Sequence, residues 1–336
     1  MSAQRLQAEA TANFLRYCPG QRKGHYESYF IRANHPTAAK AFWIRYTIFS
    51  PKNRPEAAIG ELWAIWFDEN MDAPIAAKTE FPIGQCVLNP THFNIQIGPG
   101  NSLDSVSAKG QSMNIEWDLS YKSDAAPLFF LPLSLYNLPF PKAKSLVAQP
   151  FACFNGTIKV NGSSMEIDNW LGSQNHNWGE KHTDYYAWGQ VSGFDDSPDT
   201  FLELITAKLK IGPFNTPFMT IMVLRHKGKE YRLNAVKNWF SAKAKFKYFK
   251  WKFECENAEV RVKGSIYAPN EAFVGLRYYN PPGGDKCCLN SKIAACEITI
   301  EEKSKLGIKE NVHTENRAAF EILTDDKSSH GVEIFF

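Results

Sequence analysis

The stretch TIKVNGSSMEID, residues 157–168, places Asn161-Gly162 between two segments in which apolar and polar residues alternate. An Asn-Gly pair in this setting is the strongest short signal for a β-hairpin, because both residues tolerate the positive φ angles of a tight turn. The stretch therefore predicts two antiparallel strands joined by a two-residue turn.

The same alternation recurs along the chain. In 41–49, AFWIRYTIF, Phe42 and Ile44 fall on one face while Trp43 and Arg45 fall on the other, so both faces are partly apolar. Further strands are predicted in 60–68, 93–98, 113–121, 184–194, 200–211, 245–254, 258–268 and 296–302, and 218–233 is predicted to contain two strands joined by a turn at Lys227-Gly228-Lys229. Only residues 4–17 have a helical pattern, so we expect an all-β fold with one short N-terminal helix.

The length of 336 residues favours two domains over one large β-domain, which stays the alternative. We place them at 1–150 and 151–336. Between the halves, residues 125–151 contain Pro127, Pro132, Pro139 and Pro141, which forbid a regular helix or a central strand. We expect this segment to cross between the domains with its apolar side chains buried in the interface; a lid over an apolar ligand is the alternative.

Composition excludes several classes of protein. The net charge of +3, from 38 basic and 35 acidic residues, is too balanced to predict nucleic acid or an anionic membrane as the main partner, although a local patch remains possible. The N-terminus has no apolar signal region and no stretch is apolar enough for a membrane helix, so we expect a cytoplasmic protein without stable membrane insertion. The seven cysteines have no disulfide or zinc spacing and are predicted to be free thiols, including the adjacent Cys287 and Cys288.

Residues 172–190, GSQNHNWGEKHTDYYAWGQ, are the strongest candidate site. In an extended chain His176 and Trp178 point to one side and Asn177 to the other. Tyr186 and Trp188 align on the next strand, whose spacing suits pairing with the first. A titratable group among aromatic faces suits protonation of a double bond and stabilisation of the resulting cation, without a cofactor. The alternative is that His176 is a hydrogen-bonded structural residue and the tryptophans belong to the core.

Other chemistry is less favoured. Glu180 and His182 lie near His176 in sequence, but their spacing matches no helical zinc motif and lacks a further ligand, so no metal is expected. The chain has no Gly-x-Ser-x-Gly, P-loop or Gly-x-Gly-x-x-Gly motif, which disfavours α/β hydrolases, P-loop proteins and Rossmann enzymes.

The motif His176-Asn177-Trp178-Gly179, followed by Tyr186-Ala187-Trp188-Gly189, resembles the H-N-W-G signature of carotenoid 1,2-hydratases and of AttH-like double-lipocalin proteins. The segment 24–30, GHYESYF, is similar to the first strand of that superfamily. The resemblance implies two lipocalin-like antiparallel β-barrels packed side by side, the second opening near the motif. Members and more distant relatives include polyene hydratases, pericyclases, tocopherol cyclase-like proteins and lipid binders.

The resemblance also implies roles for individual residues. The family's proton-transfer groups are the motif His and Trp with a later Tyr-x-Asp pair, which here becomes Phe201-Leu202-Glu203. His176 or Glu203 would then donate the proton, assisted by Trp178. The residues expected to contact the substrate are Asn177, Tyr186, Trp188 and Phe201.

Three functions follow as alternatives. The first is a cofactor-independent enzyme that hydrates, cyclises or isomerises a hydrophobic polyene, terpenoid or polyketide by acid assistance. The second is a pericyclase that orients its substrate by shape, and the third is a carrier of a hydrophobic ligand. The lysine- and aromatic-rich stretch 241–254 could bind single-stranded nucleic acid or an anionic substrate tail, but a strand with a lysine-rich outer face is the simpler interpretation. We therefore expect no nucleic-acid partner, and the sequence leaves the oligomeric state open.

Overall fold

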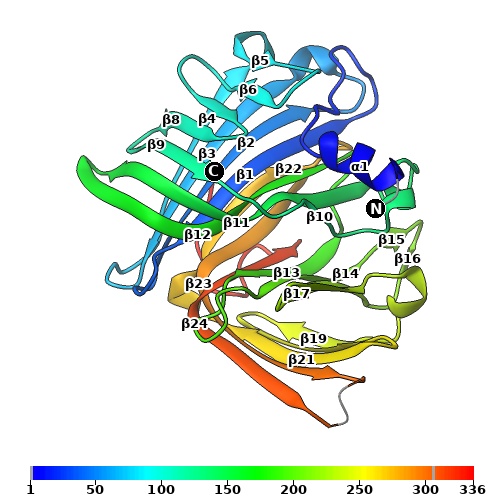
Figure 1. Ribbon diagram of the computed structural model, residues 1–336. Helices are drawn as coiled ribbons and strands as arrows, with labels where there is room; N and C mark the ends of the chain where they lie inside the picture. The colour runs from blue at the N-terminus through cyan, green and yellow to red at the C-terminus, as the bar shows by residue number, and fades with distance from the viewer. Residues whose placement is uncertain (1–2, 305–306) are drawn as a thin grey trace.

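The computed structural model describes residues 3–304 and 307–336 and consists mainly of two large curled antiparallel sheets (Figure 1). In order across the first sheet, the strands are β4 (Ile75–Pro82), β3 (Ile59–Asp68), β2 (Lys40–Ser50), β1 (His25–Asn34), β12 (Ser163–Gly179), β11 (Ala143–Val160), β9 (Ile115–Lys122), β8 (Ser107–Ser112), β7 (Ser102–Asp104), β6 (Asn94–Gln96) and β5 (Val87–Leu88). The short β10 (Leu128–Phe129) pairs with β11.

The second sheet has the order β18 (Lys229–Leu233), β17 (Met219–His226), β14 (Phe201–Lys208), β13 (Tyr185–Ser192), β24 (Lys309–Thr324), β23 (Asp285–Glu302), β21 (Val260–Tyr267), β20 (Lys250–Glu256) and β19 (Lys243–Lys247). Beside it, β22 (Val274–Tyr279) pairs with β23 and, in parallel, with β25 (Ile334–Phe335). A small hairpin is formed by β15 (Lys210–Ile211) and β16 (Phe214–Asn215). The predicted all-β, double lipocalin-like fold is confirmed.

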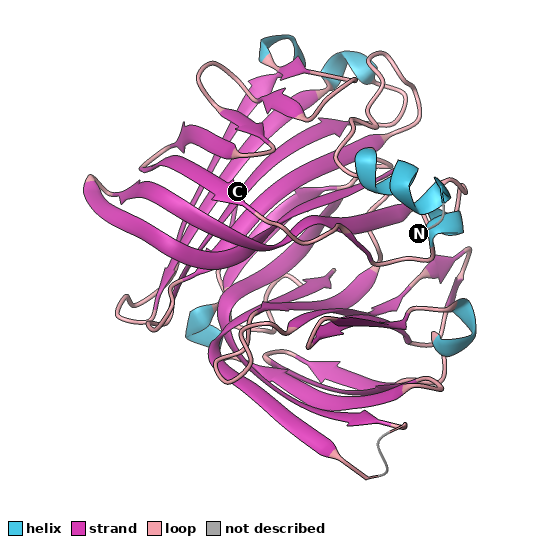
Figure 2. Ribbon diagram, viewed as in Figure 1, coloured by secondary structure: helices cyan, strands magenta, loops and turns pink. Residues whose placement is uncertain are grey.

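Helices are few and lie at the edges of the molecule (Figure 2). The α-helix α1 spans Ala3–Ala10, and the short 3-10 helices are η1 (Pro55–Ala57), η2 (Ile83–Gln85), η3 (Leu133–Tyr136), η4 (Val236–Asn238) and η5 (Asn270–Ala272). Among the described residues, no helix combines the length and the apolar character needed to span a bilayer.

The predicted N-terminal helix is present but shorter than the 4–17 pattern suggested. It ends at Ala10 because the next residues bind the first sheet instead. The main-chain N–H groups of Arg16 and Tyr17 donate hydrogen bonds to the buried carboxylate of Glu27 on β1, at distances of 2.6 to 3.0 Å. This tertiary contact outweighs the local helical preference of the segment.

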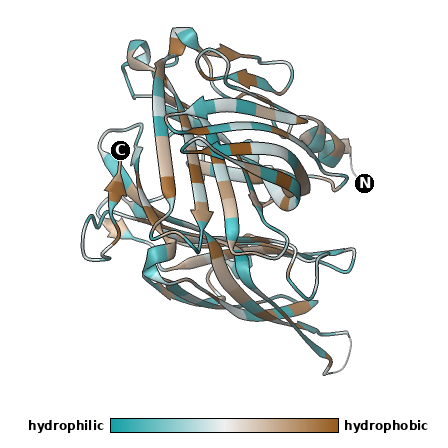
Figure 3. Cartoon of the chain, turned by 90° about the vertical axis from the view of Figure 1, so that its left-hand side faces the viewer, coloured by the Kyte–Doolittle hydropathy of each residue, from teal (hydrophilic) through white to brown (hydrophobic). Residues whose placement is uncertain are grey.

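Each sheet encloses its own aromatic core, and a third apolar cluster joins them. Alternation along β2 puts Phe42 and Tyr46 into the first core, while Trp43 on the opposite face packs with Trp188 and Leu276 of the second sheet. Figure 3 shows the two sheets stacked against each other in a view turned by 90°. The apolar character that the sequence shows on both faces of 41–49 thus reflects burial against two different layers.

The change from one sheet to the other lies in the loop 180–184, whereas the sequence suggested a division at 150/151. The hairpin of β11 and β12 turns at Asn161-Gly162, with φ angles of 52° and 81° as predicted, but both strands belong to the first sheet. β12 belongs to the first sheet because its C-terminal half pairs with β1, the first strand of that sheet in sequence.

The proline-rich segment connects two strands of the same sheet, β9 and β11, so the expected crossing between halves is wrong. Its position in the interface is nevertheless as expected. We call residues 125–142 the strap; Leu128, Phe130 and Leu131 of the strap are buried against Phe201 and Met219 of the second sheet. The strap therefore fills one end of the space between the sheets.

The lysine-rich stretch forms a hairpin of two strands, β19 and β20, with its turn at Tyr248-Phe249. Lys245 and Lys252 are exposed, while Phe246 and Trp251 are buried in the second core. This arrangement is the lysine-rich outer face favoured from the sequence. All seven cysteines are free, and Cys287 and Cys288 are buried.

Candidate active site

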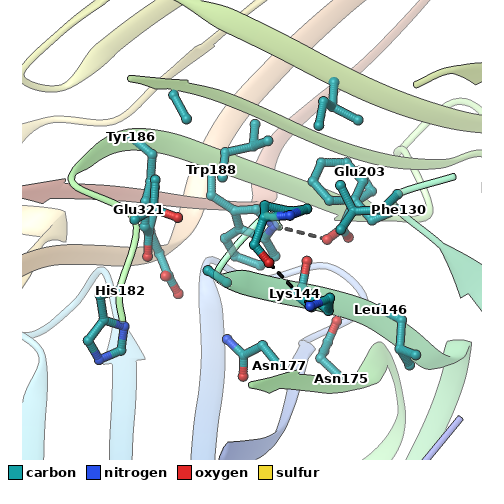
Figure 4. Close-up of a pocket in the computed structure, with 18 of the residues that line it drawn as sticks. Phe130, Lys144, Leu146, Asn175, Asn177, His182, Tyr186, Trp188, Glu203 and Glu321 are labelled. Atoms are coloured by element: carbon teal, nitrogen blue, oxygen red, sulfur yellow. Dashed lines mark hydrogen bonds between the residues drawn. The ribbon is translucent and has the colours of Figure 1, made fainter. Parts of the chain in front are cut away.

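A cavity of about 150 Å³ lies between the two sheets. An apolar cavity of roughly this volume can admit an aromatic ring. Its apolar lining includes Phe30, Trp43, Phe130, Leu131, Ile205 and Ile221. Figure 4 shows Tyr186, Trp188 and Glu203 on one side, facing Asn175 and Asn177 on the other. The site is thus built from the outer faces of both sheets, and the two barrel interiors are filled by their cores.

Strand alternation and register place the residues of the upper wall. On β13, Tyr186, Trp188 and Gln190 point to the same face, and Gln190 lies opposite Glu203 of β14. On the other neighbour of β13, Trp188 lies opposite Glu321 of β24. The indole of Trp188 is therefore flanked by two strands that each contribute a carboxyl group to the cavity lining.

Glu203 is the group with the most suitable acid chemistry. It is buried, and burial raises the pKa of Glu203 to about 7, although hydrogen bonds from Gln190 and Trp188 oppose this shift. Trp188 Nε1 donates to Oε1 at 2.9 Å and Gln190 Nε2 donates to Oε2 at 2.6 Å. Both oxygens accept hydrogen bonds from the wall, and the carboxyl group lines the cavity, so a proton on it can reach a bound ligand.

A polar network holds Glu203 and joins the two walls. The amide of Gln190 donates to Asn175 Oδ1 at 2.8 Å, and its oxygen accepts from Arg32 Nε at 2.8 Å and from Ser173 Oγ at 2.7 Å. Arg32 is fully buried on β1, so this network links β1 and β12 of the first sheet with β13 and β14 of the second. It fixes the rotamer of Gln190, and through it the carboxyl group of Glu203.

The second carboxyl group of the cavity, Glu321, is ion-paired. Lys292 Nζ donates to Glu321 Oε1 at 2.8 Å, and Asn290 Nδ2 donates to the same oxygen at 3.2 Å. Lys292 is completely buried, and burial lowers its pKa. Its ammonium group lies 5.6 Å from the ring centre of Trp188 and 5.7 Å from that of Trp43.

The other polar side chains of the lining include His182, Tyr186 and the two cations Arg45 and Lys144. Burial and the neighbouring Arg45 lower the pKa of His182 to about 3, so the imidazole is neutral and stacks on Tyr26 at 4.0 Å. Burial raises the pKa of Tyr186 well above its usual range, so this phenol stays protonated. The guanidinium of Arg45 lies 4.4 Å from the ring centre of Tyr278.

Asn177 contributes an unsatisfied polar atom. Its Oδ1 is buried and has no hydrogen-bond partner among the described residues. A buried acceptor without a partner costs free energy unless a ligand or water supplies a donor. The atom therefore marks a position where a ligand hydroxyl group can bind.

His176 and Trp178 lie on the opposite face of β12 from Asn175 and Asn177, as alternation requires. His176 borders the cavity, but its imidazole is fully buried, with Nδ1 2.8 Å from the carbonyl oxygen of Ala12 and Nε2 2.9 Å from Glu27 Oε1. It stacks on Tyr29 at 4.2 Å, while Trp178 packs with the strap and with Ala12. Both residues hold the N-terminal segment on the first sheet. This is the structural role that the sequence left open as the alternative to catalysis.

Glu27 completes this structural cluster. Burial alone would raise its pKa, but hydrogen bonds from His176 and His25 outweigh that effect and hold the pKa below its ordinary value. The carboxylate also accepts from the hydroxyl group of Tyr29 at 2.8 Å. The hydrogen-bonded pair of Glu27 and His176 therefore holds the N-terminal segment in place.

The predicted site residues thus fall into two groups. Asn177, Tyr186, Trp188 and Glu203 meet at the cavity, whereas Phe201 is buried in the cluster under the strap, in edge-to-face contact with Phe151. The expected pairing of the strand 184–194 with the preceding strand is wrong, because β12 and β13 belong to different sheets that face each other. The two strands still contribute to one site, across the interface.

Several cavity residues were not found from the sequence. For Trp43 and Arg45 the sequence did contain a signal, because both lie on the second, partly apolar face of 41–49. For Glu321 of the lining and its partner Lys292 the sequence contained no signal, because they become neighbours of Trp188 only through the pairing of β13, β24 and β23. In the described part of the chain, no three His, Cys, Asp or Glu side chains are close enough to hold a metal ion. Glu180 pairs with Lys142 and Lys23, away from the stacked His182.

Known proteins resemble this chain in sequence and fold. The sequence model of the family described as tocopherol cyclase-like matches residues 23–324. Two uncharacterized proteins, from Mycobacterium tuberculosis strains CDC 1551 and H37Rv, are each 24% identical over 279 residues, covering 82% of both chains.

Two solved structures share the fold. An AttH-like protein of Nitrosomonas europaea superimposes with a TM-score of 0.58 at 8% identity, covering 93% of this chain and 99% of its own. Kievitone hydratase of Nectria haematococca gives a TM-score of 0.57 at 12% identity and 94% coverage of both chains. Both structures support the double lipocalin-like fold that the sequence motif led us to expect.

Proposed function

The chain belongs to the tocopherol cyclase-like family, and from this premise we propose that it is a hydratase- or cyclase-type enzyme acting on a hydrophobic, unsaturated small molecule. The observation that supports this most directly is the buried Glu203, whose pKa of about 7 leaves a large protonated fraction at neutral pH. Kievitone hydratase, which has the same fold, bears the name of an enzyme that adds water to its substrate.

In the proposed reaction the carboxyl group of Glu203 gives its proton to one carbon of a substrate double bond. The π electrons form the new C–H bond and leave a cation on the other carbon, next to the faces of Trp188 and Trp43. The oxygen of water or of a substrate hydroxyl group then forms a C–O bond to that carbon. Water gives hydration, and an internal hydroxyl group gives a ring.

Glu321 is the group that we propose to accept the proton lost by the attacking oxygen. It is paired with Lys292, and it faces the same indole as Glu203. Two carboxyl groups in different environments are a common way to divide acid and base roles in one site. Proton exchange with solvent then restores both groups, so the cycle consumes no cofactor.

The test begins with the natural ligand. Native mass spectrometry of freshly purified protein identifies a co-purified apolar molecule, which is then supplied to the enzyme in D₂O together with related alkenes. We expect a product with deuterium bound to carbon. For Glu203→Gln we expect kcat to fall on the order of 10²- to 10⁴-fold, the usual range for a lost general acid.

The matched control is Glu297→Gln, which changes an exposed glutamate on the outer face of β23 and should leave turnover unchanged. A Glu203→Gln enzyme that turns over at the wild-type rate would exclude the acid mechanism and favour a pericyclase. A ligand that is released unchanged under all conditions would favour a carrier.

A further inference from the structure

The mouth of the cavity lies where three loops meet. Partly exposed lining residues beside these loops include Pro141, Lys144, Thr183 and Leu209. The strap, the β15–β16 hairpin that follows Leu209, and the loop 234–242 around η4 come together here. Trp239 of this last loop lines the cavity and packs in one cluster with the strap and Leu209.

These three loops present large apolar side chains to the outside. The exposed fractions are 49% for Leu138 and 46% for Phe140 on the strap, 75% for Phe214 on the hairpin, and 51% for Val236 and 56% for Phe240 beside Trp239. Exposed apolar side chains that are scattered singly need no explanation, but a group around one opening indicates a binding surface. We call these five residues the apolar rim.

Within the three loops themselves, the charged side chains have one sign. No aspartate or glutamate occurs in 125–165, 204–229 or 231–253, the segments that contain all three loops. The loops and their flanks contribute lysines, which are Lys142, Lys144, Lys208, Lys210 and Lys237. The nearest acids lie in the linker between the sheets, where Glu180 pairs with Lys142 and Asp184 pairs with Lys181. The overall charge of +3 therefore conceals a local excess of positive charge at the mouth.

We propose that the apolar rim docks on an anionic lipid bilayer, with the mouth of the cavity against the headgroup layer. Apolar side chains enter the boundary between headgroups and acyl chains, and lysines beside them are attracted to anionic lipids, which is the combination that peripheral membrane proteins use. The rim is shallow, formed by loops, so the protein lies on the surface and does not span it.

This orientation gives the cavity a source of ligand. A hydrophobic molecule dissolved in the bilayer can pass between the loops into the apolar cavity without crossing water, which avoids the free-energy cost of hydrating its apolar surface. This consequence rests on the proposed function, but docking itself requires neither turnover nor a known substrate.

Vesicle flotation of the full chain tests the docking. Wild-type protein should float with vesicles of phosphatidylcholine and phosphatidylglycerol, and floating should weaken at high salt or with phosphatidylcholine alone. The double variant Phe214→Ser, Phe240→Ser should lower the fraction bound on the order of tenfold or more, since both rings would lose the burial that the bilayer provides. Lys210→Gln with Lys237→Gln should remove the preference for the anionic lipid.

The matched control is Val106→Ser with Met113→Ser, which removes two comparably exposed apolar side chains, 57% and 59%, from turns of the first sheet. It should float like the wild type. Hydrogen exchange on bound vesicles should slow in 209–217 and 234–242 but not around 106–113.

The docking proposal is wrong if the wild-type protein does not float, or if the control variant binds as weakly as the rim variant. A concentration-dependent dimer without vesicles that the rim variant abolishes would identify a second copy as the occupant of the rim instead. Glu203→Gln should float normally, so failure of the acid mechanism and failure of docking can be told apart.

Discussion

The environment of Glu203 combines full burial with neutral hydrogen-bond donors. The indole of Trp188 and the amide of Gln190 orient the carboxyl group without supplying a positive charge, so desolvation outweighs their effect and its pKa rises. Arg32 donates its hydrogen bonds to Gln190 and Asn34, and its charge lowers the pKa of Glu203 by less than burial raises it. The same contacts that position the acid therefore leave it able to bind a proton at neutral pH.

This pKa predicts a pH dependence of stability. The folded protein retains the proton of Glu203 up to about pH 7, whereas the unfolded chain loses it near the ordinary value of 4.5. Stability should therefore fall as pH rises through this window, by about 3 kcal/mol if about 1.4 kcal/mol is lost per pH unit. Urea denaturation of the wild type and of Glu203→Gln at pH 5 and pH 8 measures the difference. The variant should lack this pH-dependent part of the free energy of unfolding. Identical pH dependence in both proteins would show that the carboxyl group titrates normally.

At the residue scale, the sequence identified the cavity only in part. Alternation along 172–190 correctly separated Asn177 from His176 and Trp178, but it could not say which face meets the cavity, since both faces of β12 are buried. The motif histidine was the more conspicuous candidate because imidazole titrates near neutrality. Its engagement by Ala12 and Glu27 depends on a segment more than 140 residues away, and no local pattern encodes that contact.

At the scale of elements, β12 depends on a close approach to its neighbour. Gly172 lies opposite Ala33 of β1, and a Cβ atom there would be 1.8 Å from the carbonyl oxygen of Arg32. Only glycine fits at this distance, since backbone atoms on both sides cannot yield as a flexible side chain could. The position lies two residues from Gln174 and three from Asn175 of the cavity wall.

Gly172→Ala should therefore destabilise the protein by about 1–3 kcal/mol or more, the usual cost of overpacking. The control is Gly84→Ala in η2, where an added Cβ meets nothing within 4 Å, and which should be neutral or slightly stabilising. Equilibrium denaturation of the two variants side by side checks the expectation. Equal stability of both variants would mean that β1 and β12 separate easily at this point.

Element type was predictable, and element partners were not. Period-two alternation and the turn residues at Asn161-Gly162 and Lys227-Gly228 are local signals, and the structure confirms these hairpins. The pairing of β12 with β1, and of β13 with β24, joins strands far apart in sequence. For this reason the expected β12–β13 pair was wrong, and the division at 150/151 fell inside β11.

For the whole molecule, the feature that decides whether the two sheets fold together is the interface between them. Trp43, Trp63 and Phe67 of the first sheet pack against Trp188 and Leu276 of the second, and all but Trp188 are almost completely buried. Separated sheets would expose this surface to water, at a cost of roughly 25 cal/mol per Å² of apolar area. The two sheets should consequently behave as one folding unit.

Expression of residues 1–181 and 182–336 as separate chains tests this expectation. Each half alone should bind an apolar dye and lack a cooperative thermal transition, and co-expression should restore both the transition and the solubility. A cooperative transition in either half alone would show that its core suffices and that the interface is dispensable.

Because the site lies between two filled cores, the residues that determine ligand binding are largely separate from those that determine folding stability. Wall positions such as Ile205 and Ile221 line the cavity and belong to neither barrel core, so their exchange leaves both of these cores unchanged. Substitutions in the wall formed by one half of the chain can therefore change substrate preference without changes in the other half. The strands that position the acid group stay the same.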